Sequence, residues 1–171
     1  MTVLLLVCLA ACGGVASTAS DAERPKGVAI GYQAPGFELP ALDGSGALAL
    51  DDLRGKVVVM SFWASWCTPC RLEVPALEDA WQRYKSKDVV ILGLSVDDTK
   101  GEADSFLKMY PVTFPMVLDA GGGVSNHWQV MSLPTTVILD KSGVVRRRHI
   151  GYTPQQLRAT LAEVDELLKE P

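Results

Sequence analysis

The stretch that decides the fold is VVVMSFWASWCTPC, residues 57–70. It opens with a continuous run of β-branched and apolar residues, Val57–Phe62, which is typical of a strand covered on both faces. A helix is expected to follow from about Thr68 to Tyr84, with an apolar stripe along one side. That stripe consists of Leu72, Ala76, Leu77, Ala80 and Tyr84. Cys67 and Cys70 therefore lie where a buried strand ends and a helix begins.

This position gives the two cysteines a chemical meaning. Backbone N–H groups at the start of a helix lack partners within it and carry positive potential. Both effects favour a thiolate over a thiol, so Cys67, the nearer to the helix start, is expected to be the nucleophile. Cys70 lies one turn further in and is expected to be the shielded, resolving thiol. Pro69 is compatible with this arrangement, because proline is tolerated in the first turn of a helix.

Two other uses of a C-x-x-C pair compete with redox chemistry. A structural zinc site needs four ligands, and beyond this pair the mature domain offers only His127 and His149, each isolated in the sequence. A structural disulfide is poorly motivated, because a bridge across two residues constrains the unfolded chain little. The strand–helix context therefore favours a redox pair that needs neither a metal nor an organic cofactor.

The rest of the chain predicts an α/β fold with a mixed central sheet flanked by helices. A second buried strand, Val89–Val96, completes a βαβ unit with the first strand, and such crossovers are right-handed. The other expected strands are Phe37–Pro40 and Ala47–Leu50, an N-terminal hairpin, then Met116–Leu118, Thr135–Leu139 and Val144–Ile150. The other expected helices are Glu102–Met109, Val124–Trp128 and one that Thr153 caps before Pro154. The helix at Glu102 and the strand at Met116 form an inserted βα unit.

Composition limits the possible partners. The chain has 171 residues, of which 48% are hydrophobic and 21% charged, with a net charge of −4. These values fit one domain with a substantial core and do not favour binding to nucleic acid, which requires a basic face. The one basic run, Arg146–Arg148, lies in a strand-like segment, where charge usually protects an exposed sheet edge.

The N-terminus resembles a secretion signal. Val3–Ala11 is apolar but shorter than the roughly 20 residues that span a bilayer. The end of this run together with the next residue, Leu9-Ala10-Ala11-Cys12, resembles the lipobox of bacterial lipoproteins. This resemblance implies lipidation of Cys12 and a membrane anchor. The alternative is ordinary secretion with Cys12 unmodified. We expect a signal peptide at 1–11, a lipidated terminus and flexible tether at 12–29, and the folded domain at 30–171, outside the cytoplasm, where cysteines can stay oxidised.

The segment Phe62–Cys70 resembles the active site of thioredoxin-fold proteins. It is most similar to the extracytoplasmic TlpA/ResA/CcmG branch, a redoxin or AhpC/TSA-like group of thiol–disulfide oxidoreductases. The likeness extends from about Gly31 to the C-terminal helix, nearly the whole mature domain. The N-terminal hairpin and the extra unit at Gly101–Asp119 also match this branch.

The resemblance implies roles for individual residues. Pro134, which follows Leu133, takes the place of a cis-proline that faces the disulfide and whose backbone pairs with an extended substrate. Trp66 takes the place of an aromatic residue that shields the site, and its alternative role is core packing. Together with Thr68 and Pro69 between the cysteines, these residues are the expected substrate-binding set.

Two positions concern proton transfer. Glu73 lies three residues after Cys70, on the same helical face, where ResA-type proteins carry an acidic residue. It is expected to accept the Cys70 proton, although a solvated charge beside Arg71 is the alternative. Ser61 stands where thioredoxin has a buried acid and this branch often has asparagine. Because serine cannot act as the base, proton transfer would depend on Glu73.

The predicted function is reduction of protein disulfides outside the cytoplasm, possible clients including the apocytochromes of cytochrome c maturation. A membrane-associated electron donor would reduce the Cys67–Cys70 bond after each turnover. One alternative is a thiol-dependent peroxidase, but its P-x-x-x-T-x-x-C motif requires proline and threonine where this chain has Met60 and Ala64. A second alternative is a non-catalytic binding module, which the presence of both cysteines disfavours.

Overall fold

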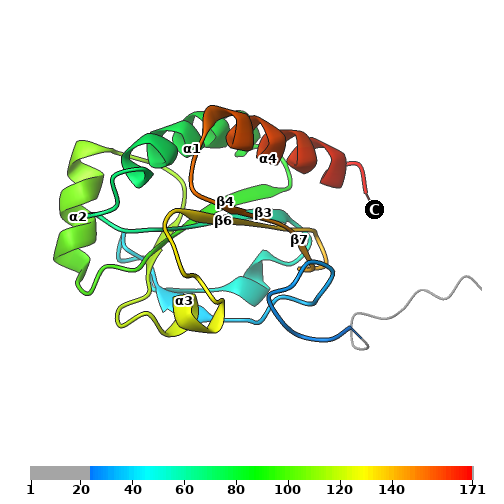
Figure 1. Cartoon of the computed structure of the whole chain (residues 1–171), viewed down its shortest axis with the longest axis horizontal. Helices are drawn as coiled ribbons and strands as arrows, with labels where there is room; N and C mark the ends of the chain where they lie inside the picture. The colour runs from blue at the N-terminus through cyan, green and yellow to red at the C-terminus, as the bar shows by residue number, and fades with distance from the viewer. Residues whose placement is uncertain (1–23, 171) are drawn as a thin grey trace, which may run out of the picture.

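A five-stranded mixed sheet forms the centre of the protein (Figure 1). The computed structural model describes residues 24–170. The strands lie in the order β5-β4-β3-β6-β7, with β3 parallel to β4 and antiparallel to β6. Their bounds are β3 Val57–Trp63, β4 Val89–Ser95, β5 Met116–Leu118, β6 Thr135–Leu139 and β7 Val145–Ile150. A separate antiparallel hairpin consists of β1 Glu38–Pro40 and β2 Ala47–Ala49. The predicted thioredoxin-like fold, including the N-terminal hairpin and the inserted βα unit, is confirmed.

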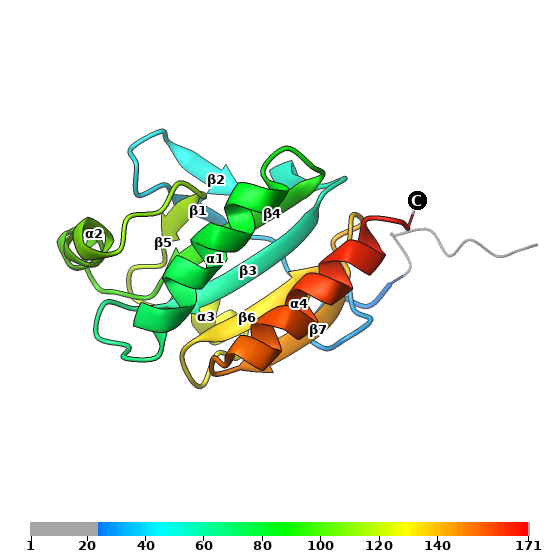
Figure 2. The same cartoon turned by 90° about the horizontal axis from the view of Figure 1, so that it is seen from above.

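Helices cover both faces of this sheet. They are η2 Leu50–Leu53 (a 3-10 helix), α1 Cys70–Tyr84, α2 Lys100–Met109, α3 Gly123–His127 and α4 Pro154–Leu167. Helices α1 and α4 lie on one face, and α3 lies on the other (Figure 1). Seen from above, α1 lies over β3 and β4, α4 lies over β6 and β7, and α2 lies beyond the β5 edge (Figure 2).

The apolar run that opens the deciding stretch fills the cores on both sides of the sheet. Every residue of β3 and β4 is buried. Because successive strand residues point to opposite faces, Val57 and Val59 pack under α1 and α4. Val58 and Met60 pack on the opposite side, in a cluster that also contains Trp128 at the end of α3. This two-sided burial holds the end of β3 rigidly, and the cysteines follow directly.

Helix α1 departs from the sequence prediction at its start. It begins at Cys70 rather than Thr68, because the Thr68 carbonyl accepts a turn hydrogen bond from the Arg71 N–H. The regular helical pattern starts one residue later, where the Pro69 carbonyl accepts from the Glu73 N–H. The prediction that Leu72 belongs to the apolar stripe is wrong, since this side chain is 67% exposed. At 100° per residue it lies about 140° around the helix from the buried Leu77.

Other boundaries differ by a few residues. Helix α2 begins at Lys100 rather than Glu102, because Thr99 and Glu102 form a reciprocal capping box. Leu50 starts the 3-10 helix η2 instead of ending a strand. The C-terminal helix begins as expected, with the Thr153 side chain accepting a hydrogen bond from the Gln156 N–H and Pro154 in the first turn.

The arginine run lies on the edge strand β7, as predicted for charges that protect a sheet edge. Arg146 pairs with Asp140 and Glu170, and Arg147 pairs with Glu163 of α4. Arg148 donates hydrogen bonds to the carbonyls of Trp128 and Gln129, so all three arginines have partners within the protein.

Residues that precede Ile30 already contact the folded domain. The Gly27 N–H donates a hydrogen bond to the Gln33 carbonyl at 2.9 Å. Val28 packs against the same core cluster as Val58 and Met60. Among residues 24–170, no helix has both the length and the apolar composition needed to cross a membrane. The predicted signal peptide and Cys12 lie outside the described residues.

Candidate active site

Cys67 and Cys70 form a disulfide in the loop between β3 and α1. Their sulfur atoms are 2.03 Å apart and their Cα atoms 5.3 Å apart. The Cys70 N–H, the first of helix α1, points at the Cys67 sulfur at 3.2 Å. The sulfur of Cys67 therefore lies at the helix start, where a developing thiolate would meet backbone N–H groups.

Cys67 opens onto a cleft, and Cys70 does not. The cleft has a volume of about 500 Å³. Its lining consists of Trp66, Cys67, Thr68, Pro69, Val96, Ser125, Val130, Met131, Ser132 and Leu133. Two large apolar side chains in this lining are exposed to solvent, Trp66 at 66% and Met131 at 91%. Trp66 is thus not a core residue, and four of the five expected substrate-binding residues line the same cleft.

Pro134, the fifth, follows the cleft residue Leu133. The Leu133–Pro134 peptide bond is cis, as the resemblance implied. The Pro134 carbonyl accepts a hydrogen bond from the Gly151 N–H at 2.7 Å, which ties the start of β6 to the end of β7. The segment beside the cleft is therefore anchored to the sheet.

Glu73 is buried, with 4% of its surface exposed. One carboxyl oxygen accepts a hydrogen bond from the Ser61 hydroxyl at 2.6 Å, and the other accepts one from Thr136 at 2.8 Å. Burial raises the pKa of the Glu73 carboxyl above its ordinary value, and these two hydrogen bonds oppose the rise. The structure thus excludes the alternative of a solvated surface charge.

Ser61 and Thr136 are partners of Glu73 that the sequence reasoning missed. In the sequence alone, Ser61 stands out only as a residue that cannot act as a base. It lies directly opposite Thr136 in the pairing of β3 with β6, so the two hydroxyls are neighbours beneath α1. A hydroxyl inside an otherwise apolar buried strand needs a hydrogen-bond partner, and this was the available signal.

Asp97 is a second residue that the sequence reasoning missed. It is buried just after β4, at the carboxyl edge of the sheet. Its carboxylate accepts hydrogen bonds from the Ser65 N–H at 3.0 and 3.1 Å, the Ser65 hydroxyl at 2.8 Å and the Ser95 hydroxyl at 2.7 Å. It therefore holds the loop that leads into Trp66 and Cys67.

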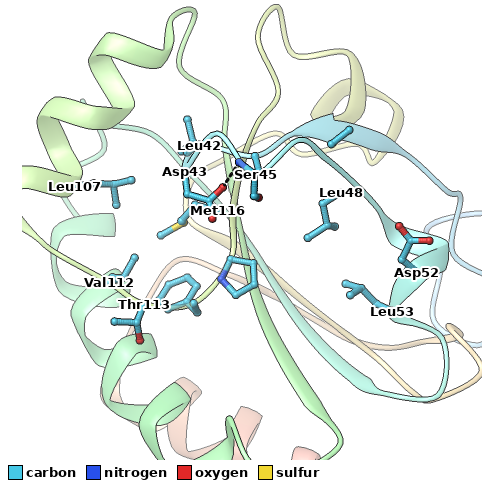
Figure 3. Close-up of a pocket in the computed structure, with 14 residues that line it drawn as sticks. Leu42, Asp43, Ser45, Leu48, Asp52, Leu53, Leu107, Val112, Thr113 and Met116 are labelled. Atoms are coloured by element: carbon cyan, nitrogen blue, oxygen red, sulfur yellow. Dashed lines mark hydrogen bonds between the residues drawn. The ribbon is translucent and has the colours of Figure 1, made fainter.

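A second cavity lies away from the disulfide and is lined by different residues (Figure 3). Its volume is about 530 Å³, and it is bordered by the hairpin, η2 and the segment 107–116. In Figure 3, Asp43 and Ser45 lie near Met116 and are joined by a hydrogen bond of 2.9 Å from the Ser45 N–H. None of the predicted site residues lines this cavity.

Within residues 24–170, no three His, Cys, Asp or Glu side chains are grouped closely enough to hold a metal ion. His127 lies in α3 and His149 in β7, on different elements.

A disulfide at the junction of a central strand and a helix, beside a cis-proline, defines a thioredoxin-fold thiol–disulfide oxidoreductase. Residues 30–148 match the AhpC/TSA family, and the chain belongs to that family. It is 35% identical to a thiol-disulfide oxidoreductase ResA of Bacillus cereus over 164 residues, which cover 94% of each chain. It is also 39% identical to ResA of Geobacillus kaustophilus, covering 85% of this chain and 83% of that relative.

A similar solved structure is a Chlorobium tepidum protein described as a thiol:disulfide interchange protein DsbE. The TM-score is 0.78 at 32% sequence identity, covering 82% of this chain and 99% of that one. The predicted family, fold and enzyme class are thus confirmed.

Proposed function

We propose that this oxidoreductase works as a reductant of protein disulfides outside the cytoplasm. The observation that carries the proposal is the Cys67–Cys70 disulfide, in which only Cys67 lines the open cleft. An extended substrate segment can approach Cys67 between Trp66 and Met131, whereas Cys70 stays covered. The reducing direction is supported by the resemblance to a branch that consists mostly of reductants.

The reaction has two exchange steps. The Cys67 thiolate attacks one sulfur of a substrate disulfide, forming a mixed disulfide and releasing the other substrate sulfur as a thiolate. Cys70 then attacks the Cys67 sulfur, which releases the second substrate thiolate and forms the bond seen in the structure. A membrane-associated donor supplies two electrons to restore the dithiol. The substrate is oriented along the cleft by Thr68, Pro69, Leu133 and Pro134.

Glu73 has a defined task in the second step. Cys70 attacks well only as a thiolate, so its proton must be accepted nearby. Glu73 lies one helical turn further on α1, and its carboxyl is held in place by Ser61 and Thr136. Because burial raises its pKa, the carboxylate is a better proton acceptor than a surface glutamate.

The proposed location follows from the N-terminal sequence. Residues 1–11 serve as a signal peptide, Cys12 carries the lipid, and residues 12–29 connect it to the domain at 30–171. Metabolic labelling with a palmitate analogue tests this, with Cys12→Ser as the variant that should lose the label and Cys8→Ser as the control that should keep it. Label that survives Cys12→Ser would contradict the anchor.

Trapping identifies the client. A Cys70→Ala variant cannot complete the second step and should accumulate as a mixed disulfide through Cys67, which mass spectrometry can resolve. Recovery of apocytochrome c would support a role in cytochrome c maturation, whereas a broad mixture of proteins would indicate general thiol reduction. Absence of mixed disulfides with the full chain in cells would contradict the proposed function.

The direction is tested by the reduction potential of the pair. A reductant should lie toward the value of about −270 mV found for thioredoxin. A value near about −120 mV, as in DsbA, would assign the protein to the oxidants instead.

A further inference from the structure

A crevice distinct from the substrate cleft reaches the carboxyl of Glu73. Glu73 does not line that cleft. It instead lines a narrow crevice of about 10 Å³ together with Thr136, His149, Tyr152 and Gln156. This volume is close to the minimum that holds one water molecule, about 10–15 Å³. The crevice therefore offers the Glu73 carboxyl a place to exchange protons with a water molecule.

The register of the sheet leads from Glu73 to the sheet edge. Ser61 on β3 lies opposite Thr136 on β6, and Thr136 lies opposite His149 on β7. Residues opposite one another point to the same face, so this polar row runs beneath α1 and α4. Strand β7 is the edge of the sheet, with α4 above it (Figure 2). His149 is half-buried there, between the crevice and solvent.

The titratable groups around the crevice differ in their ability to accept a proton. Burial raises the pKa of Tyr152, and the negative charge of Glu73 adds a smaller rise, so the phenol stays protonated. Burial and the nearby Arg147 lower the pKa of His149, and Glu163 of α4 opposes this shift. A neutral imidazole near pH 7 is thus available to accept and release protons.

We propose that His149 carries protons between the buried Glu73 carboxyl and solvent, through one water held in the crevice beside Thr136. This proposal rests on the proposed role of Glu73. As the Cys70 sulfur attacks Cys67, its proton forms the Glu73 carboxylic acid. That acid gives the proton to the crevice water, which passes one of its own to an imidazole nitrogen. The imidazolium then releases a proton to solvent, so the carboxylate is restored and no electrons move in these steps.

His149 acts through Glu73 and not on the sulfur atoms, so chemical rescue is the informative test. Reduced full-length protein is mixed with glutathione disulfide in weakly buffered solution at pH 7, and release of the second glutathione is followed in a single turnover. His149→Ala should slow this release about tenfold, below the roughly 10²–10⁴-fold typical of direct acid–base groups. Added imidazole should restore the rate. His127→Ala removes the exposed histidine of α3 and should change neither the rate nor its response to imidazole.

Several outcomes would overturn the proposal. One is an unchanged rate in His149→Ala, and another is a slow rate that imidazole fails to restore. If His149→Ala folds poorly, His149→Gln replaces the imidazole with a neutral group of similar size, and a full rate in this variant also overturns the proposal. Glu73→Gln separates the two claims. If Glu73→Gln is slow and His149→Ala is not, only the role of His149 fails, whereas a full rate in Glu73→Gln removes both roles.

Discussion

Asp97 should support both the stability of the domain and the geometry of its active-site loop. Replacing it by alanine removes the acceptor for the Ser65 N–H, the Ser65 hydroxyl and the Ser95 hydroxyl. An unsatisfied buried polar group costs about 1–3 kcal/mol, and Ser95 is fully buried whereas Ser65 is partly exposed. We therefore expect a loss of about 3 kcal/mol in the free energy of unfolding.

Thermal unfolding of the oxidised protein measures this loss. For a domain of this size, about 3 kcal/mol corresponds to a decrease in Tm of roughly 6–12 °C. The neighbouring Asp98 is exposed, so Asp98→Ala is the matched control and should stay within about 0.5 kcal/mol of the wild type. Insulin reduction should also slow in Asp97→Ala, because the loop before Cys67 loses its anchor. Equal Tm values for the two variants would refute the reasoning.

Three further predictions concern proton linkage, substrate contact and peroxide. Burial raises the pKa of the Glu73 carboxyl in the folded state above its ordinary value of 4.5. The protonated carboxyl therefore stabilises the fold below pH 4.5, and this stabilisation is lost as the pH rises through the raised pKa. The free energy of unfolding of Glu73→Gln, measured in urea, should lack that loss with rising pH. Parallel pH profiles for the wild type and the variant would contradict this prediction. Trp66→Ala should raise the KM for insulin with little change in Tm, whereas the similarly exposed Leu72→Ala, a control outside the cleft lining, should alter neither. Peroxide should not be consumed with dithiothreitol as donor, and rapid consumption that requires Cys67 would revive the peroxidase alternative.

Local sequence predicted those parts of the fold that local chemistry determines. The β3 run, the Cys67–Cys70 pair and the Thr153 cap of α4 are encoded within a few adjacent residues. The start of α1 was wrong by two residues, because the Thr68 carbonyl is used in a turn with Arg71 and regular helical bonding begins at the Pro69 carbonyl. Placing Leu72 in the apolar stripe was also wrong, although the helical period already puts it about 140° away from Leu77.

Contacts between distant segments could not be predicted in the same way. Glu73 meets Ser61 and Thr136 only because β3 and β6 pair in one particular register beneath α1. Asp97 reaches Ser65 only because β3 and β4 are adjacent and end together. A single sequence does not specify these registers, so the hydrogen bonds around the site emerged only from the structure.

The Cys67 sulfur is the centre of the account, and substituting it gives the most direct test. Insulin reduction with dithiothreitol as donor should be catalysed by the wild type and should fall to the uncatalysed rate in Cys67→Ser. Cys70→Ser should instead accumulate as a mixed disulfide with insulin when dithiothreitol is left out, because Cys67 can still attack but nothing then resolves the bond. Full insulin-reductase activity in Cys67→Ser would contradict the assignment of this pair as the reacting dithiol.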